Sequence, residues 1–211
     1  MRVFITGTDT DVGKTLISSW LCLHTGYGYF KPIQTGSLLG FDRHQVVQMS
    51  GAHTYTECFV YKDPVSPHLA ASREGGEIPL HALTLPTQDR LIIEGAGGVL
   101  VPINKHALMV DLMAQWNVPV ILVARPSLGT INHTLLSLEA LRQRHVPILG
   151  VILNGPLEND NAKAIEHYGN VRVLASMLPL SNVCKATLQR IPLSPDLERI
   201  FHHDNTQDDT Q

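Results

Sequence analysis

Residues 7–15 have the types and spacing that hold a nucleotide triphosphate. They read Gly-Thr-Asp-Thr-Asp-Val-Gly-Lys-Thr, and they separate an apolar run at residues 3–5 from a helix-forming run that begins at Leu16. In such a segment the backbone N–H groups of the loop and of the helix N-terminus face the phosphates. We expect Lys14 to reach the β- and γ-phosphates and the Thr15 hydroxyl to ligate Mg²⁺.

The first glycine of this loop is displaced. The common pattern G-x-x-x-x-G-K-[ST] would place glycine at position 8, where the chain has Thr8, and the glycine stands one place earlier, at Gly7. The segment is therefore a variant of the general phosphate-binding loop.

Charged residues follow two further apolar runs. Lys31 comes after residues 29–30, and it is either a surface lysine or a cation placed near the phosphates. Glu94 ends the run at residues 91–93 and precedes a glycine-rich segment, which favours a Mg²⁺-binding carboxylate over an ordinary strand-end acid. Asp42 precedes a helical run, and taken alone it is better explained as a helix N-cap.

Further polar residues follow the later apolar runs. Asn154 either makes a turn or reads the edge of a purine base with its amide. Gly129 and Thr130 precede a helical run, so they form either a helix start that is free to bind an anion or a simple cap.

Apolar runs and helical patterns alternate along the chain. Runs rich in β-branched residues occur at residues 3–6, 29–33, 91–94, 118–124, 148–154 and 171–174. Helical spacing occurs at residues 16–24, 43–50, 108–116, 132–144 and 162–167. This alternation predicts a doubly wound α/β fold of the P-loop NTPase type, with a mostly parallel sheet and helices on both faces, in a single domain over residues 1–201. Prolines predict a loop at residues 63–68 and little helix at residues 79–86.

Composition narrows the class of protein. The 211 residues are 44% hydrophobic and 17% charged, which suits one α/β domain with a large core. The net charge of −3 without a long basic run argues against a nucleic-acid partner, and no run approaches the length of about 18 apolar residues typical of a membrane span. Three widely spaced cysteines predict a reduced, cytoplasmic protein. We expect the polar residues 202–211 to form a disordered tail.

Together these segments resemble the dethiobiotin synthetase family of biotin synthesis. The resemblance covers roughly residues 2–180 and includes the loop at residues 7–15, Lys31-Pro32, Thr35-Gly36, Ser66-Pro67-His68, Glu94-Gly95-Ala96-Gly97-Gly98 and the segment at residues 128–133. It implies an ATP- and Mg²⁺-dependent ring closure of 7,8-diaminopelargonate (7,8-diaminononanoate) with CO₂ to dethiobiotin, through a carbamate and a carbamic–phosphoric anhydride. It also implies a homodimer with its sites at the interface.

The resemblance assigns roles to positions of this chain. The residues implied in catalysis are Lys31, Lys14, Thr10, Asp11 and Thr35. Those implied in nucleotide binding are Asp11, Val12, Gly13, Lys14, Thr15, Leu16, Asp42, Glu94, Gly97, Asn154, Leu178, Pro179 and Leu180. The Mg²⁺ ligands would be Thr15, Asp42 and Glu94, so the family context overturns the N-cap reading of Asp42. The substrate would be bound by Lys31, Thr35, Gly129, Thr130 and Asn132.

The chain departs from the family pattern in places. Asp11 stands where the family commonly has glutamate, and the segments before Lys31 and before Leu91 are short. The alternative function is an ATPase switch of the partition or septum-positioning class, but that class carries lysine where this chain has Asp9. An amide-forming ATPase of the cobyrinate-amidating type would need a glutaminase domain for which 211 residues leave no room. A non-catalytic relative would not need the full set of charged residues.

Overall fold

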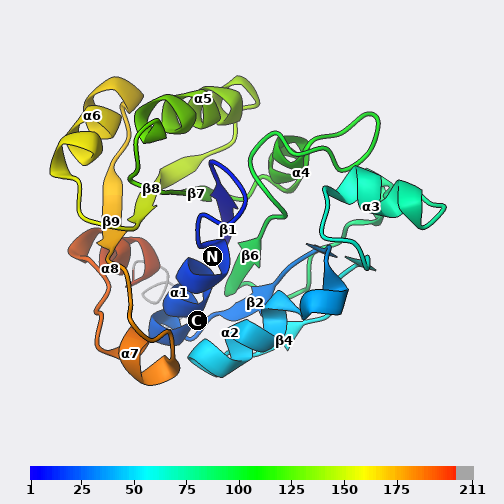
Figure 1. Ribbon diagram of the computed structural model, residues 1–211, viewed down its shortest axis with the longest axis horizontal. Helices are drawn as coiled ribbons and strands as arrows, with labels where there is room; N and C mark the ends of the chain where they lie inside the picture. The colour runs from blue at the N-terminus through cyan, green and yellow to red at the C-terminus, as the bar shows by residue number, and fades with distance from the viewer. Residues whose placement is uncertain (203–211) are drawn as a thin grey trace, which may run out of the picture.

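A parallel sheet forms the centre of the fold in the computed structural model, which describes residues 1–202. Within that range the sheet has seven strands in the order β4-β2-β6-β1-β7-β8-β9 (Figure 1). The strands are β1 (Arg2–Gly7), β2 (Gly28–Phe30), β4 (Thr54–Tyr55), β6 (Leu91–Glu94), β7 (Val120–Ala124), β8 (Ile148–Asn154) and β9 (Val173–Met177). Strand β1 lies between β6 and β7, and Ile5 is in register with both Glu94 and Ile121.

Helices cover both faces of this sheet (Figure 1). Side chains such as Ile17, Trp20 and Leu188 pack on the face that includes Ile5, and this face is covered by α1 (Lys14–Thr25), α2 (Asp42–Ser50), α7 (Lys185–Gln189) and α8 (Pro195–His202). The opposite face, which includes Phe4, is covered by α4 (Met109–Trp116), α5 (Thr130–Gln143) and α6 (Asn159–Gly169). The predicted doubly wound α/β fold is therefore confirmed.

The central strands are buried because their sequences are apolar on both faces. Every residue of β7 has an exposed fraction of 0%, and adjacent residues of β1 contribute to opposite hydrophobic clusters, Phe4 to one and Ile5 to the other. Nearly continuous apolar runs are typical of strands in a sheet covered on both sides. The alternation of side chains along each strand thus builds two cores from one run of residues.

The expected strand at residues 29–33 is wrong as a single element. It divides at Lys31 and Pro32 into β2 in the main sheet and β3 (Ile33–Gln34), which pairs with β5 (Phe59–Val60) in a separate small sheet. Pro32 has no N–H to donate to a strand ladder. Its carbonyl instead accepts hydrogen bonds from the N–H groups of Cys58 and Phe59. Because of this break, Lys31 lies between β2 and β3 and belongs to neither strand.

The expected loop at residues 63–68 is wrong in its last two residues. Helix α3 (Pro67–Arg73) begins at a proline, which is compatible with the first turn of a helix because that N–H has no intrahelical partner. Short 3₁₀ turns occur at η1 (Ser37–Leu39) and η2 (Leu80–Ala82), the latter within the segment where little helix was expected. The sequence patterns did not predict β4, β5, α3, α7 or α8, which are short.

Two expectations concern the membrane and the end of the chain. Within residues 1–202, no helix combines the length and the apolar character needed to cross a membrane. The expected tail at residues 202–211 lies outside the described residues except for His202, where α8 ends.

A buried ion pair fixes the start of α2. The Glu57 side chain has an exposed fraction of 0% and accepts a hydrogen bond from the Arg43 guanidinium, which also lies 4.6 Å from the ring centroid of Phe41. Among the described residues, Oε1 of Glu57 has no hydrogen-bond partner. The neutralisation of Glu57 therefore depends on Arg43.

We predict that Arg43→Met destabilises the protein by about 3 kcal/mol, because removing one partner of a buried pair leaves the other charge without compensation. The matched control is Arg73→Met, which breaks the pair with Asp63 whose side chains are 50% and 43% exposed. Such an exposed pair contributes under about 1 kcal/mol. Urea unfolding of both variants measures the difference, and equal losses of stability would contradict the assignment.

Candidate active site

The carboxyl ends of β1, β2 and β6 meet at one edge of the sheet. The loop at residues 8–13 follows β1, Lys31 follows β2, and Glu94 is the last residue of β6. In an open parallel sheet, ligands bind beyond the carboxyl ends of the strands, where the strand order reverses. This edge is therefore the place to look for a site.

The loop after β1 is held by hydrogen bonds to β7 and β8 and by one within the loop. The N–H of Thr8 donates to the carbonyl of Val123 at 3.0 Å, at the end of β7. The side-chain amide of Asn154, at the end of β8, donates to the carbonyl of Val12 at 2.9 Å. The Lys14 ammonium closes the loop by donating to the carbonyl of Asp9 at 3.0 Å. The loop is thus shaped by contacts within the protein.

Left-handed backbone conformations give the loop its turn. Asp11 has a φ of 52° and Gly13 a φ of 94°. A Cβ atom at Gly13 would lie 2.0 Å from Nδ2 of Asn154, so the position accepts only glycine for two independent reasons. The side chains of Thr10 and Asp11 are exposed, Val12 is buried, and Leu16 is half-buried against the α1 core.

Glu94 is the hub of polar contacts at this edge. It is 1% exposed, and its Oε1 accepts a hydrogen bond from the Thr15 hydroxyl at 2.8 Å. The Lys31 ammonium lies 3.4 Å from the same oxygen. The Tyr29 hydroxyl donates to Oε2 at 2.9 Å. The buried carboxylate is thus neutralised and hydrogen-bonded by residues from α1, from β2 and from the segment after β2.

Lys31 also pairs with Asp42, and this contact shows where the Asp42 side chain points. Asp42 is the first residue of α2, the residue in the N-cap position is Phe41, and the Asp42 carboxylate accepts a hydrogen bond from Lys31. The backbone N–H of Asp42 donates to Oε1 of Gln34 at 3.2 Å. The N-cap explanation for Asp42 is wrong, because its side chain points to Lys31 and not to the backbone of its own helix.

The surroundings shift the acidities of the buried groups in different directions. Burial would lower the pKa of Lys31, but the carboxylates of Glu94 and Asp42 outweigh it, so the pKa is raised and the ammonium stays charged. Burial lowers the pKa of Lys14, and the attraction of Glu94 only partly offsets this effect. Burial, followed by the negative charge of Glu94, raises the pKa of Tyr29 well above its ordinary value, so its hydroxyl keeps its proton.

The donor set at this edge suits Mg²⁺. Carboxylate oxygens of Asp42 and Glu94 contact the Lys31 ammonium, and the Thr15 hydroxyl donates to Glu94. Mg²⁺ takes hard oxygen ligands from one or two carboxylates together with substrate phosphates. Within residues 1–202 no cluster of three or more His, Cys, Asp and Glu side chains could hold a metal ion. The carboxylates and the hydroxyl present fit a metal that is shared with a nucleotide.

The glycine-rich segment after β6 packs against the loop after β1. Gly97 has a φ of 68°, and a Cβ atom there would lie 2.6 Å from Cγ2 of Val101. A Cβ atom at Gly98 would lie 3.3 Å from the carbonyl oxygen of Gly7. The absence of side chains lets the two backbones approach each other.

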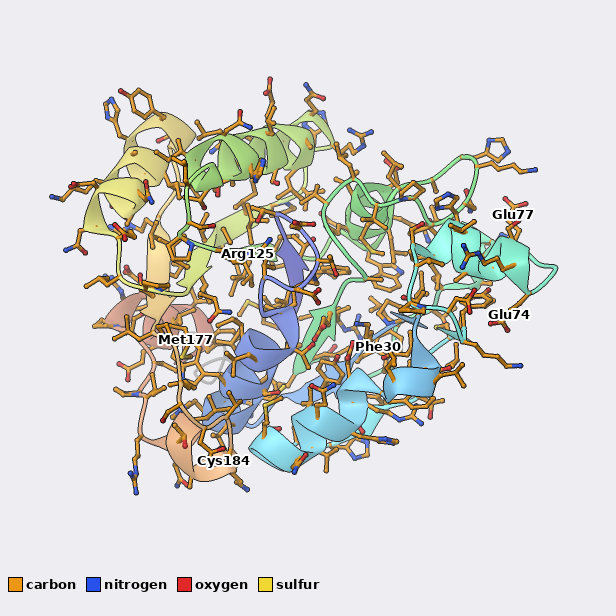
Figure 2. All side chains as sticks on the ribbon, viewed as in Figure 1. Phe30, Glu74, Glu77, Arg125, Met177 and Cys184 are labelled. Atoms are coloured by element: carbon orange, nitrogen blue, oxygen red, sulfur yellow. The ribbon has the colours of Figure 1, made fainter. Side chains whose placement is uncertain are left out.

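The residues expected to bind the adenine base lie at the ends of adjacent strands. Asn154 is in register with Met177, the last residue of β9. Leu178 and Pro179 are exposed and Leu180 is half-buried, in the segment between Met177 and Cys184 (Figure 2). The Asn154 amide contacts the phosphate-binding loop in this structure, so it links the two parts of the expected nucleotide site.

Of the expected substrate-binding residues, Lys31 belongs to the Glu94 cluster, and the others stand on different segments of the chain. Gly129, with a φ of 93°, precedes α5, where Thr130 is buried and Asn132 is exposed. Among the described residues, Oγ1 of Thr130 has no hydrogen-bond partner. Thr35 is half-buried and precedes η1. The structure thus brings Lys14, Thr15, Lys31, Asp42 and Glu94 together at this edge of the sheet.

Sequence reasoning missed two polar residues at this edge. Tyr29 was seen only as part of a strand, because its contact with Glu94 depends on the register of β2 against β6. Arg125, after β7, lies beside the loop and bridges to the Asp9 carboxylate at 3.2 Å (Figure 2). An arginine directly after the apolar run at residues 120–124 was the available signal for the second.

Comparisons with known proteins agree with the geometry. A family model described as an AAA domain matches residues 1–187. The chain is 49% identical to an ATP-dependent dethiobiotin synthetase of Lawsonia intracellularis, over 95% of this chain and 99% of that protein. This chain belongs to the dethiobiotin synthetase family. A synthetase of the same description from Paramagnetospirillum magneticum is 52% identical, over 90% of this chain and 94% of that protein.

Solved structures of other proteins have a fold similar to that of this protein. A ParA family ATPase from Chlorobium tepidum superposes with a TM-score of 0.54, over 94% of this chain and 91% of that chain, at 12% identity. A putative plasmid partition protein from Borrelia burgdorferi gives a TM-score of 0.53 over 96% and 98%, also at 12% identity. At this identity the likeness shows the fold alone. The sequence identities place this chain in the dethiobiotin synthetase family, so we set aside the alternative of a partition ATPase.

We predict that Gly13→Ala weakens ATP binding at least about tenfold, because a side chain at this position is strained and collides with Asn154 at the phosphate-binding loop. Gly26→Ala is the matched control, since Gly26 ends the same helix with a φ of 72° and no atom within 4 Å of a Cβ. Both variants lose about 1 to 2 kcal/mol of stability from the left-handed backbone. Calorimetric titration with ATP distinguishes them, and equal affinities would contradict the role of Gly13.

Proposed function

We propose that this protein, as an ATP-dependent dethiobiotin synthetase of biotin biosynthesis, joins CO₂ to 7,8-diaminopelargonate and closes the cyclic urea. The observation that carries the proposal is the placement of Lys14 and Lys31 around the buried carboxylate of Glu94, at the edge where the phosphate-binding loop begins its helix. This arrangement gathers positive charge beside the expected position of the γ-phosphate.

The reaction needs such charge because its partners repel one another. One amine of the diamine takes up CO₂ to form a carbamate, which is a poor electrophile. A carbamate oxygen then attacks the γ-phosphorus of ATP, and ADP leaves. The second amine attacks the carbamic–phosphoric anhydride, closes the ring and releases phosphate. Bringing an anionic carbamate to an anionic phosphate requires cations in fixed positions.

The lysines have distinct tasks in this proposal. Lys14 is the first residue of α1, and its ammonium donates to the Asp9 carbonyl. A small movement would let it donate instead to an oxygen of a phosphate bound by the same loop. Lys31 stays charged between Glu94 and Asp42, and it is the cation available to the carbamate and the γ-phosphate. Thr10, Asp11 and Thr35 line the approach to these groups in our proposal.

We assign Thr15, Asp42 and Glu94 to Mg²⁺, which would neutralise phosphate charge when bound together with ATP. The two carboxylates already meet at one cation, the Lys31 ammonium, and the Thr15 hydroxyl contacts the Glu94 carboxylate. In our proposal the backbone N–H groups of Gly13, in the loop after β1, and of Gly97, after β6, donate to phosphate oxygens. Asn154 with Leu178, Pro179 and Leu180 would hold the adenine base.

The substrate and the assembly complete the proposal. We assign the helix start at Gly129, Thr130 and Asn132, in which Gly129 and Asn132 are exposed, to the substrate carboxylate, contributed across the interface of a homodimer. Exposed large apolar side chains support such an interface; they include Leu38, Leu39, Leu100 and Leu128. We further propose that the enzyme works in the cytoplasm, in keeping with its free cysteines.

The central prediction is that the protein converts diaminopelargonate, bicarbonate and MgATP to dethiobiotin, ADP and phosphate. Mass spectrometry of the product and a coupled assay of ADP measure the conversion. Omitting the diamine is the control, because release of ADP should depend on it. ADP release that ignores the diamine, without any dethiobiotin, would defeat the proposed function.

We also predict that Lys31→Gln lowers turnover by at least about a hundredfold while leaving ATP affinity largely intact, because it removes the cation available to the carbamate. Lys105→Gln, which changes an exposed lysine outside the site, serves as the control. Single-turnover kinetics and ATP titration are measured on both variants. Turnover of Lys31→Gln at the level of the unaltered protein would show that Lys31 has no such role.

A further inference from the structure

Tyr29 occupies a position from which it can act on Glu94. It lies in β2 in register with Ile92 of β6, and Glu94 is two residues further along β6 on the same face of the sheet. Diagonal neighbours on adjacent strands are about 7 to 8 Å apart, which a long aromatic side chain can span. The Tyr29 side chain is 0% exposed, and its hydroxyl reaches Oε2 of Glu94 at 2.9 Å.

The donors around Glu94 are divided between its two oxygens. Oε1 faces the Thr15 hydroxyl and the Lys31 ammonium, whereas Oε2 faces the Tyr29 hydroxyl. The last torsion of a glutamate side chain is broad and has no sharp preference of its own. The orientation of the carboxylate plane is therefore set by these external contacts.

Most of these contacts are expected to change during the reaction. In the proposed function, Lys31 turns to the carbamate and the Thr15 hydroxyl turns to the metal. Tyr29 is buried in the hydrophobic cluster that includes residues of α1, and its hydroxyl donates to Oε2 of Glu94. In the proposed function this hydroxyl contacts neither nucleotide nor substrate. It is the contact that can stay in place while the others exchange.

We propose that Tyr29 is a positioning residue that holds Glu94 by Oε2 so that Oε1 faces Thr15 and the metal–nucleotide complex. The inference rests on the proposed function, in which Glu94 binds Mg²⁺. Hydrogen-bond partners that orient a ligating carboxylate typically change metal affinity tenfold to about a hundredfold when removed. Tyr29 acts through Glu94 and does not touch the reacting atoms.

The test compares the binding of ADP with and without Mg²⁺ to this protein. Calorimetric titration in Mg²⁺ and in EDTA gives two dissociation constants, and their ratio measures how much the metal adds to nucleotide binding. We expect Tyr29→Phe, which keeps the ring, to reduce this ratio about tenfold and to leave the affinity in EDTA unchanged. The control is Tyr27→Phe, which alters another buried tyrosine, stacked edge-on against Phe201 at 5.4 Å.

A double-mutant cycle separates action through Glu94 from a general loosening of the core. In a Glu94→Gln background, Tyr29→Phe should change the ratio by less than about twofold, because the charge that Tyr29 orients is gone. A ratio in Tyr29→Phe equal to that of the unaltered protein would overturn the role of Tyr29 alone. An equal loss of affinity in EDTA would also overturn it, since that marks a purely structural effect. If the unaltered protein bound ADP equally with and without Mg²⁺, both this inference and the metal role of Glu94 would fall.

Discussion

The burial of one carboxylate, that of Glu94, organises the active edge of this protein. An ionised side chain with an exposed fraction of 1% is costly unless it is paired and hydrogen-bonded. Lys31 supplies the charge, and Thr15 and Tyr29 supply hydrogen bonds. These partners come from separate elements, and Lys31 extends the network to Asp42 at the start of α2. Helix α1, strand β2 and helix α2 are therefore held in place around the Glu94 carboxylate.

The features that depend on local pattern could be predicted from the sequence. Continuous apolar runs identified the central strands β1, β6, β7 and β8, and the helical spacing between them gave the two covering layers. Because parallel strands end at one edge, the same pattern placed Lys31 and Glu94 beside the loop that ends in Lys14 and Thr15. The family resemblance then corrected the reading of Asp42, which local propensity alone had assigned to a cap.

The features that depend on register and on long-range contacts could not be predicted. The break between β2 and β3 at Pro32 is decided by hydrogen bonds from Cys58 and Phe59, which are distant in sequence. The contact between Tyr29 and Glu94 requires knowing that Tyr29 lies opposite Ile92. Short elements such as β4 and α7 carry too few residues for a periodic signal and are stabilised by tertiary packing.

The anchoring of the phosphate-binding loop has a consequence for the thermodynamics of ligand capture. The loop is tied to β7 through Thr8 and to β8 through Asn154, while Gly13 and Asp11 already hold their unusual backbone angles. A segment that is ordered in advance loses little conformational entropy when a phosphate arrives, so more of the interaction energy is expressed as affinity. The conformational entropy of the loop was lost when the chain folded. The nucleotide therefore binds to a loop whose conformation is already formed.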